Sequence, residues 1–298
     1  MASIAPAETV IGFIGAGKMG MPMIEHLLAA GYRVVACDPQ AGGREAARAA
    51  GCSIADDVAA CVRAAGVVIS SLPNDVAFGT VVREIAAAGR GGLIHVDTST
   101  VSPGISAEAA TLHADRGIAY LRSTVSGNPV VARAARLTVM ASGPRATYDF
   151  VKPLLDTFGS THYYLGVAEE ARIIKLVINL MIAGTAGLMA EALVLGQKGG
   201  LDWAQMLDVI GGSAAASPMV NYKVPPLAAR DYSSTFSGLQ MIKDLDLILG
   251  EGARSGVPLA LTAQVRQMYE AIRAQGDGEL DYIATVRLME RMAGLPDQ

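Results

Sequence analysis

The first half of the chain alternates short apolar runs with longer segments of mixed polarity. Val10 to Ile14, Tyr32 to Cys37 and Gly66 to Ser70 are rich in β-branched residues, and a segment with helical spacing follows each. Further runs of this kind cover residues 92–96, 118–121 and 137–141. Short buried strands separated by helices are typical of a parallel sheet with helices on both faces. The pattern therefore predicts a doubly wound α/β domain.

After Gly166 the strand-like runs end, and helical spacing continues to the C-terminus. The longest predicted helix covers residues 168–197, and its middle, Leu176 to Ala190, is almost entirely apolar. This uncharged run is shorter than the roughly 18 residues that a membrane span needs. We therefore expect a helix buried between domains or subunits, and no membrane span. The predicted boundary separates an α/β domain (1–166) from an all-helical domain (167–298).

The turn after the first strand has the glycine spacing of a dinucleotide-binding loop, and it reads Gly15-Ala16-Gly17-Lys18-Met19-Gly20. The first glycine allows a tight turn, the second lets the backbone approach a pyrophosphate, and the third lets the helix pack closely on the strand. The N-terminus of that helix offers N–H groups and a positive dipole to phosphates. Residues 15–20 are therefore predicted to bind a cofactor in a Rossmann-type domain.

Asp38 ends the second strand, 18 residues after Gly20, which is close to the spacing of a ribose-binding acid. A carboxylate there accepts hydrogen bonds from both ribose hydroxyls and repels a 2′-phosphate, so NAD is favoured over NADP. The alternative is that Asp38 only caps the loop Pro39 to Gly43. NADP remains an alternative cofactor, because the guanidinium of Arg44 is able to reach a 2′-phosphate.

Two further loops follow strands at the carboxyl edge of the predicted sheet. One contains Leu72 and Pro73, and the other contains Ser99 and Thr100. Ligands of such sheets bind outside the carboxyl ends of the strands. Both loops are therefore expected to face the cofactor.

Composition narrows the class of protein. The 298 residues are 51% hydrophobic, and the formal charge of −4 gives no electrostatic footprint for nucleic acid. Three cysteines in apolar surroundings suggest a reduced cytoplasmic protein, and the first eight residues do not resemble a signal peptide. The four histidines lack metal-ligand spacing, so no metal site is expected.

Lys175 and Asn179 lie four residues apart, which on a helix places them on one face, one turn apart. A buried ammonium group beside an amide is costly unless it serves a ligand. The alternative is a lysine at the edge of the helix that extends its ammonium group to water.

Taken in order, these segments resemble the β-hydroxyacid dehydrogenase family, the group of 3-hydroxyisobutyrate dehydrogenase and tartronate semialdehyde reductase, related to 6-phosphogluconate dehydrogenase. The matching segments run nearly end to end: 13–23, Leu72-Pro73, Asp97-Thr98-Ser99-Thr100, Val125-Ser126-Gly127, Leu137-Thr138-Val139-Met140, Lys175 with Asn179, and Lys243-Asp244-Leu245. The resemblance implies a Rossmann domain, a long interdomain helix, an all-helical C-terminal domain and a homodimer or homotetramer.

The resemblance also implies a reaction, the reversible transfer of a hydride between a nicotinamide and the hydroxyl-bearing carbon of a 3-hydroxy acid. Lys175 would be the general acid/base, and Asn179 would hold it or the substrate. Ser126 and Gly127 would anchor the carboxylate, and Lys243 would reach the cofactor and carboxylate on domain closure. Four residues would line the nicotinamide: Leu72, Pro73, Ser99 and Thr100.

The chain departs from the family around the substrate loop. Members usually read Asp-Ala-Pro-Val-Ser-Gly-Gly where this chain has Arg122 to Asn128, and Arg136 is unusual in the next segment. We expect Asn128 and Arg122 to contact a larger or second polar substrate group. Arg122 has a structural alternative, an ion pair with Asp97 or another acid. Two other functions remain open, an imine reductase of the same fold and a catalytically silent NAD-binding module.

Overall fold

The computed structural model describes residues 4–6 and 9–296. Residues 1–3, 7–8 and 297–298 lie outside this part, and they include most of the segment from which no signal peptide is expected. The chain divides into two compact units, Met1–Lys175 and Leu176–Gln298. The division falls inside the long helix α8 (Glu170–Lys198) and not at residue 166, because the first turns of α8 are bonded to the sheet of the first unit.

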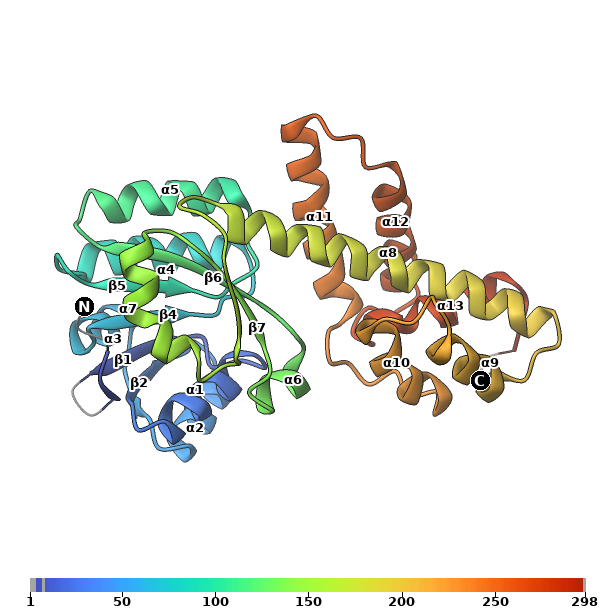
Figure 1. The fold of residues 1–298 in the computed structure, drawn as a ribbon, viewed down its shortest axis with the longest axis horizontal. Helices are drawn as coiled ribbons and strands as arrows, with labels where there is room; N and C mark the ends of the chain where they lie inside the picture. Colours follow the sequence, from blue (N-terminus) through green and yellow to red (C-terminus); the bar gives the residue numbers. More distant parts are fainter. Residues whose placement is uncertain (1–3, 7–8, 297–298) are drawn as a thin grey trace. The chain divides into compact units, whose positions relative to one another are not determined.

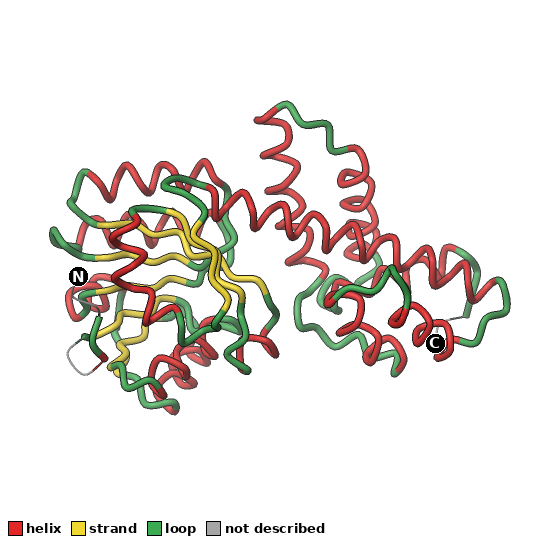
Figure 2. Tube along the Cα trace, viewed as in Figure 1, coloured by secondary structure: helices red, strands yellow, loops and turns green. Residues whose placement is uncertain are grey.

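The first unit is built on one eight-stranded sheet with the strand order β3-β2-β1-β4-β5-β6-β7-β8. The strands of the sheet are yellow in Figure 2. Neighbouring strands are parallel except β6 and β7, which are antiparallel, so the predicted α/β class is confirmed with one departure from a purely parallel sheet. The strands are β1 (Val10–Ile14), β2 (Arg33–Cys37), β3 (Ser53–Ile54), β4 (Val67–Ser70), β5 (Ile94–Asp97), β6 (Ala119–Ser126), β7 (Thr138–Ser142) and β8 (Thr161–Tyr164).

Helices cover both faces of this sheet (Figure 1). Successive strand residues point to opposite faces, so Ile69 of β4 packs in one core with Leu27, and Val68 packs in another with Ile85. The helices of the first unit that precede α8 are α1 (Gly20–Ala29), α2 (Ala41–Ala49), α3 (Val58–Ala64), α4 (Asp75–Ala88), α5 (Pro103–Ala114), α6 (Pro129–Arg133) and α7 (Arg145–Leu155).

The hydrophobic pattern misses the two edge strands and the second half of β6. β3 has only two residues, and β8 alternates between exposed and half-buried positions, so neither forms an apolar run. β6 continues beyond Leu121 to Ser126, although Arg122, Ser123 and Thr124 are polar. These residues are buried because β7 pairs with them along their whole length.

The second unit consists of helices that pack around α8. Ala183, Ala186, Ala190 and Leu193 of α8 are fully buried in its core. The predicted all-helical character is confirmed. The remaining elements of this unit are α9 (Trp203–Gly212), α10 (Pro218–Ala228), α11 (Gly238–Ser255), α12 (Ala260–Ala274), the 3-10 helix η2 (Tyr282–Ala284) and α13 (Thr285–Met292).

Within the described residues, α8 is the one helix with the length and apolar composition to cross a membrane. Its two sides differ. The alanine side lies in the core of the second unit, whereas Met181, Leu188 and Leu195 are 65%, 69% and 76% exposed. The predicted burial therefore applies to only one side of the helix.

Candidate active site

The glycine loop follows β1 and has the geometry that the sequence predicts. Gly15 has φ 98°, and a Cβ on it would lie 2.3 Å from the Ser71 carbonyl oxygen. A Cβ on Gly20 would lie 1.9 Å from the Gly15 carbonyl oxygen. A Cβ on Gly17 would meet nothing within 4 Å. The first and third glycines are therefore required by the fold, and the second leaves an open face, as close approach of a pyrophosphate requires.

Asp38 lies directly after β2 and is 9% exposed. Its two carboxylate oxygens accept hydrogen bonds from the backbone N–H groups of Ala16 and Gln40, each at 2.7 Å. The side chain thus ties the end of β2 to the glycine loop and also caps the loop after it. A carboxylate has about four acceptor positions, so two stay available for ribose hydroxyls. Arg44 donates to the carbonyl oxygens of Asp38 and Pro39, at 2.9 and 2.8 Å.

A cavity of about 330 Å³ opens beside the glycine loop. Its walls come from the loop, the first turns of α1, the start of α2 and the end of α6. The lining residues are Ala16, Gly17, Lys18, Met21, Pro22, Glu25, Gly42, Gly43 and Arg133. This volume lies at the lower end of ligand pockets in proteins. Met19 lies in the turn that leads into α1, and no side chain forms a capping hydrogen bond there within the described part of the chain.

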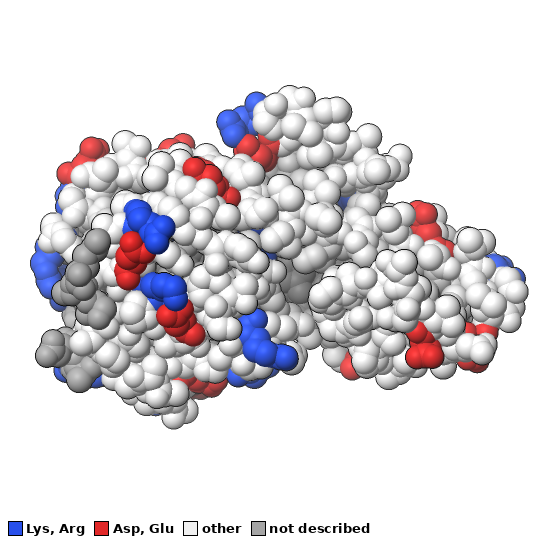
Figure 3. Space-filling view, viewed as in Figure 1, with Lys and Arg blue, Asp and Glu red and all other residues white. Residues whose placement is uncertain are grey.

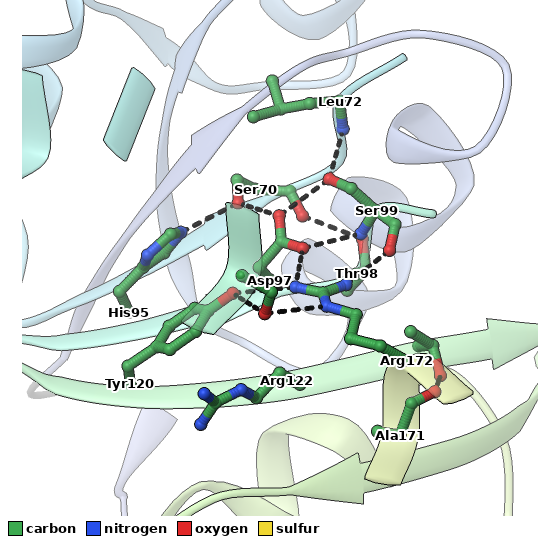
Figure 4. Close-up of polar contacts among 12 residues, drawn as sticks. Ser70, Leu72, His95, Asp97, Thr98, Ser99, Tyr120, Arg122, Ala171 and Arg172 are labelled. Carbon is green, nitrogen blue, oxygen red and sulfur yellow. Dashed lines mark hydrogen bonds and ion pairs between the residues drawn. The ribbon is translucent and has the colours of Figure 1, made fainter. Parts of the chain in front are cut away.

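The loops after β4 and β5 are bonded to each other, as their position at one edge of the sheet predicts. The Leu72 N–H donates to Ser99 Oγ at 2.8 Å, and Ser99 Oγ donates to Asp97 Oδ1 at 2.7 Å (Figure 4). Thr98 Oγ1 donates to the Ser70 carbonyl oxygen at 2.9 Å. Pro73 and Thr100 flank these contacts in sequence. The four residues predicted to line the nicotinamide therefore belong to one connected pair of loops.

A buried polar network lies beneath these loops, around Asp97 (Figure 4). Asp97 Oδ2 forms an ion pair with Arg172 of α8 at 2.5 Å, and both side chains are 0% exposed. Arg172 also binds the Tyr120 hydroxyl at 2.8 Å. Burial acts to lower the pKa of Arg172, but Tyr120 and Asp97 outweigh it and the pKa is raised. The guanidinium is therefore charged near neutral pH.

Two histidines extend this network. His95 lies 2.8 Å from Ser70 Oγ and 2.9 Å from His113 Nε2. Burial lowers the pKa of His113 to about 4, and burial together with the neighbouring His113 and Arg172 charges lowers the pKa of His95. Both imidazoles are therefore neutral near pH 7.

Lys175 follows Arg172 by three residues on α8, is half-buried and is the last residue of the first unit. In the second unit, Asn179 is 5% exposed and donates through Nδ2 to Asp244 Oδ2 at 2.5 Å. The other oxygen of Asp244 lies 2.6 Å from Lys243 Nζ. Asp244 thus joins two of the predicted site residues, Asn179 and Lys243.

The predicted substrate loop lies at the end of β6. Gly127 has φ 136°, and a Cβ on it would lie 2.7 Å from Leu137 Cδ2, so the turn after Ser126 requires glycine. Asn128 caps α6, because its Oδ1 accepts a hydrogen bond from the Val131 N–H at 3.0 Å. Its contact with substrate stays a prediction.

Arg122 has an acidic partner, but it is not Asp97. The side chain is buried, forms an ion pair with Glu169, and stacks 4.6 Å from the centre of the Tyr120 ring. Figure 4 shows its guanidinium pointing away from Asp97. These contacts correspond to the structural alternative, whereas its contact with substrate stays a prediction.

Sequence reasoning assigned no role to three residues that organise these contacts, Tyr120, Arg172 and Asp244, and it considered Asp97 only as a partner for Arg122. Asp97 and Asp244 lie in the segments that carry the family resemblance, so an acidic residue at a strand end or beside Lys243 was an available signal. The signal for Arg172 was a positive charge in the first turn of a helix whose middle is almost entirely apolar. No pattern pointed to Tyr120.

No metal-binding group of three or more His, Cys, Asp or Glu side chains occurs among residues 4–6 and 9–296. Cys37, Cys52 and Cys61 are buried and free. Burial raises the pKa of Cys52 to about 11. Burial also raises the pKa of Cys37 and Cys61, so the protonated thiol predominates near neutral pH.

Two family descriptions match the chain. Residues 10–166 match the NAD binding domain of 6-phosphogluconate dehydrogenase, and residues 170–289 match the NAD-binding domain of NADP-dependent 3-hydroxyisobutyrate dehydrogenase. The first match covers the sheet and the glycine loop, and the second covers α8 to α13. The open face of Gly17 and the remaining acceptor positions of Asp38 fit a dinucleotide.

Characterised relatives match over nearly the full length. The chain is 34% identical to 2-(hydroxymethyl)glutarate dehydrogenase of Eubacterium barkeri, over 96% of each chain. It is 32% identical to L-threonate dehydrogenase of Cupriavidus necator, over 93% of this chain and 95% of the relative. A solved structure of Mycobacterium tuberculosis 3-hydroxyisobutyrate dehydrogenase with L-serine has 30% identity and a TM-score of 0.86, covering 94% and 99% of the two chains.

An imine reductase from Pseudomonas sp. also resembles the chain, with a TM-score of 0.64 and 20% identity over 94% of this chain and 99% of the other. At this identity the likeness shows the fold alone. The family matches and the relatives above agree in both fold and type of reaction. The chain therefore belongs to the β-hydroxyacid dehydrogenase family and is an NAD(P)-dependent oxidoreductase of hydroxy acids.

Proposed function

We propose that the protein interconverts a 3-hydroxy acid of the 3-hydroxyisobutyrate type and its semialdehyde or keto form. One contact carries this proposal: Arg172 Nη1 donates to the Ser99 carbonyl oxygen at 2.5 Å. The start of α8 is thereby attached to the loop that we expect beside the nicotinamide. Lys175 follows about 4.5 Å further along the helix axis.

In this proposal Lys175 is the general acid/base. It accepts the hydroxyl proton during oxidation and returns it during reduction. NAD(P), when bound, accepts or supplies the hydride. Asn179 orients Lys175 or the substrate, and the hydrogen bond that its Nδ2 donates to Asp244 fixes the amide.

The substrate carboxylate is held by Ser126 and Gly127, through a hydroxyl and backbone N–H groups, and Lys243 supplies positive charge to the carboxylate and cofactor. Asp244 orients the Lys243 ammonium group. Asn128 and Arg122 are assigned to a further polar group of the substrate, with the Glu169 pair as the competing role for Arg122.

The preferred cofactor in this proposal is NAD, with NADP as the alternative. The support is Asp38, whose carboxylate is held beside the glycine loop by the Ala16 N–H. A fixed negative charge there repels a 2′-phosphate. Arg44 is turned to the carbonyl groups of Asp38 and Pro39, which favours NAD further.

The test is turnover with a defined panel: 3-hydroxyisobutyrate, 2-(hydroxymethyl)glutarate and L-threonate, each with NAD⁺ or NADP⁺. Formation of the reduced nicotinamide is followed by its absorbance, with Lys175→Ala as the control. Turnover of at least one acid that falls in the control supports the proposal. Turnover only of cyclic imines with a reduced cofactor would favour an imine reductase. Cofactor binding without any turnover would favour a silent module.

We further propose a cytoplasmic homo-oligomer, a dimer or tetramer that binds neither membrane nor nucleic acid. The exposed apolar side of α8, with Met181, Leu188 and Leu195, supports association between copies. Three buried free thiols suit a reducing compartment. Light scattering on the purified protein tests the oligomeric state, and a monomer at micromolar concentration would contradict the proposed homo-oligomer.

A further inference from the structure

Arg172 has an unusual position for an arginine. It is the largest fully buried side chain of the described chain, yet it lies in the first turn of α8. Its guanidinium donates to Asp97 Oδ2 at 2.5 Å, the Ser99 carbonyl at 2.5 Å and the Tyr120 hydroxyl at 2.8 Å (Figure 4). A fourth acceptor is Ser106 Oγ at 3.2 Å. These acceptors come from β5, the loop after it, β6 and α5. No substrate can touch this side chain, because none of it is exposed.

The same carboxylate that binds Arg172 also orders the loops at the edge of the sheet. Asp97 Oδ1 accepts hydrogen bonds from Ser70 Oγ at 2.5 Å and Ser99 Oγ at 2.7 Å. Ser99 Oγ in turn accepts from the Leu72 N–H at 2.8 Å. One chain of short contacts therefore runs from Leu72 through Ser99 and Asp97 to Arg172.

We propose that Arg172 is a positioning residue, which fixes α8 so that Lys175 lies in register with the loops of Leu72 and Ser99. This inference rests on the proposed function, because it assigns the proton transfer to Lys175. A helix is stiff over one turn, so a shift or rotation of Arg172 moves Lys175 with it. Four hydrogen bonds in fixed directions define both the position of the helix along its axis and its rotation about that axis. An apolar side chain makes no such directional contacts.

A gain in stability alone does not explain the buried ion pair of Arg172 and Asp97. Taking two charges out of water is expensive, and well-packed apolar residues often stabilise a buried site equally well. A planar guanidinium that is bound by acceptors from four segments instead fixes the position of α8 relative to those segments. Misplacement of a reacting group by about 1 Å lowers catalysis by about 10²-fold.

The first experiment compares the full-length wild type with Arg172→Lys. Lysine keeps the charge and is able to reach Asp97, but it cannot bind all four acceptors. We expect kcat to fall about 10-fold to 100-fold, while the dissociation constant of NADH, measured by fluorescence titration, changes by less than about 2-fold. Hydrogen exchange should accelerate in the peptide covering residues 170–176.

The matched control is Arg230→Lys, which weakens a buried ion pair with Glu290 in the second unit. It should lower the melting temperature without changing kcat or exchange at residues 170–176. Equal kinetic losses in both variants would overturn the inference, because any lost ion pair would then have the same effect.

A double-mutant cycle tests whether Arg172 acts through Lys175. In the Lys175→Ala background, Arg172→Lys should lower kcat by less than about 2-fold, since there is no acid/base left to position. Multiplicative losses would overturn the positioning role while leaving Lys175 in the mechanism. Unchanged turnover in Lys175→Ala itself would overturn the proposed function of Lys175 and with it this inference.

Tyr120→Phe serves as a milder variant if Arg172→Lys does not fold. It removes one hydrogen bond to Arg172 and leaves the ion pair with Asp97 intact. A fall in kcat of about 2-fold to 10-fold that disappears in the Lys175→Ala background supports the inference. A fall of the same size in both backgrounds contradicts it.

Discussion

Asp97 of β5 and Arg122 of β6 lie opposite each other in the sheet register, yet each forms its ion pair with a residue in or just before the first turn of α8. Asp97 binds Arg172, and Arg122 binds Glu169, the residue just before the helix. Both pairs are largely buried within the first unit. The start of the helix that carries Lys175 is thereby fixed to two neighbouring strands.

We predict that Arg122→Ala and Glu169→Ala destabilise the protein to a similar extent. Each change leaves the partner charge buried without its counterion, which typically lowers the free energy of unfolding by about 3 to 5 kcal/mol. Urea unfolding of both single variants and the double variant measures this free energy. The double variant should lose less than the sum of the two single losses.

If Arg122 binds substrate, Arg122→Ala would also weaken the binding of 2-(hydroxymethyl)glutarate, which has a second carboxylate, by about 1.5 to 3 kcal/mol. The binding of 3-hydroxyisobutyrate would weaken much less.

Lys175→Ala should lower kcat by about 10² to 10⁴, the usual effect of losing a positioned acid/base. The affinity for NADH should change little. Steady-state kinetics on the best acid of the panel measures the loss. Lys198→Ala, at the exposed end of the same helix, is the control. A folded Lys175→Ala protein with wild-type turnover would remove Lys175 from the mechanism.

Asp38→Ala should narrow the preference for NAD over NADP. Loss of the carboxylate removes hydrogen bonds to the ribose, which is expected to cost about 1.5 to 3 kcal/mol, and it also removes the repulsion of a 2′-phosphate. The ratio of kcat/KM values for the two cofactors is the measurement. Glu45→Ala, which removes an exposed carboxylate of α2, should leave that ratio unchanged. A wild-type protein that already prefers NADP would show that this interpretation of Asp38 is wrong.

Asp244→Asn should lower turnover more than Asp246→Asn does. Asp244 is 1% exposed and contacts both Asn179 and Lys243, so the amide disturbs two site residues together. We expect about a 10-fold fall in kcat/KM, the effect of losing one charged hydrogen bond. Asp246 lies on the same helix, is 55% exposed and pairs with Arg266. Equal kcat/KM values in the two variants would show that Asp244 does not contribute to the reaction.

Stability should fall as pH decreases from 6.5 towards 4, in part because of His113. Burial lowers its pKa from 6.5 to about 4, so the unfolded chain binds a proton in this window and the folded chain does not. Protonation therefore favours unfolding as pH falls, by up to about 3 kcal/mol. Melting temperatures across this range measure the effect. His113→Gln, which does not titrate, should show a flatter dependence, and an identical slope would exclude His113.

The linear pattern of residues was sufficient for much of the fold. Apolar runs such as Val10 to Ile14 are local, so they mark strands wherever both faces of a sheet are buried. The glycine loop and Asp38 were equally predictable, because a tight turn and a strand-end acid depend on near neighbours in the chain. The same reasoning failed for β8 and the end of β6, whose burial or pairing depends on strands far away in sequence.

The partners of charged side chains were decided only by the tertiary structure. Arg122 was expected to bind substrate or to pair with an acid, and the fold brings it Glu169 from 47 residues away. Arg172 stood out in the sequence only as a charge near the start of a long helix, and the fold brings it to Asp97 from 75 residues away. What a buried charged side chain binds depends on its removal from water and on the groups that folding brings next to it. Local spacing in the sequence encodes neither of these. The sequence by itself therefore determined the class of fold and the family, whereas the tertiary structure decided how the helix of Lys175 is held in place.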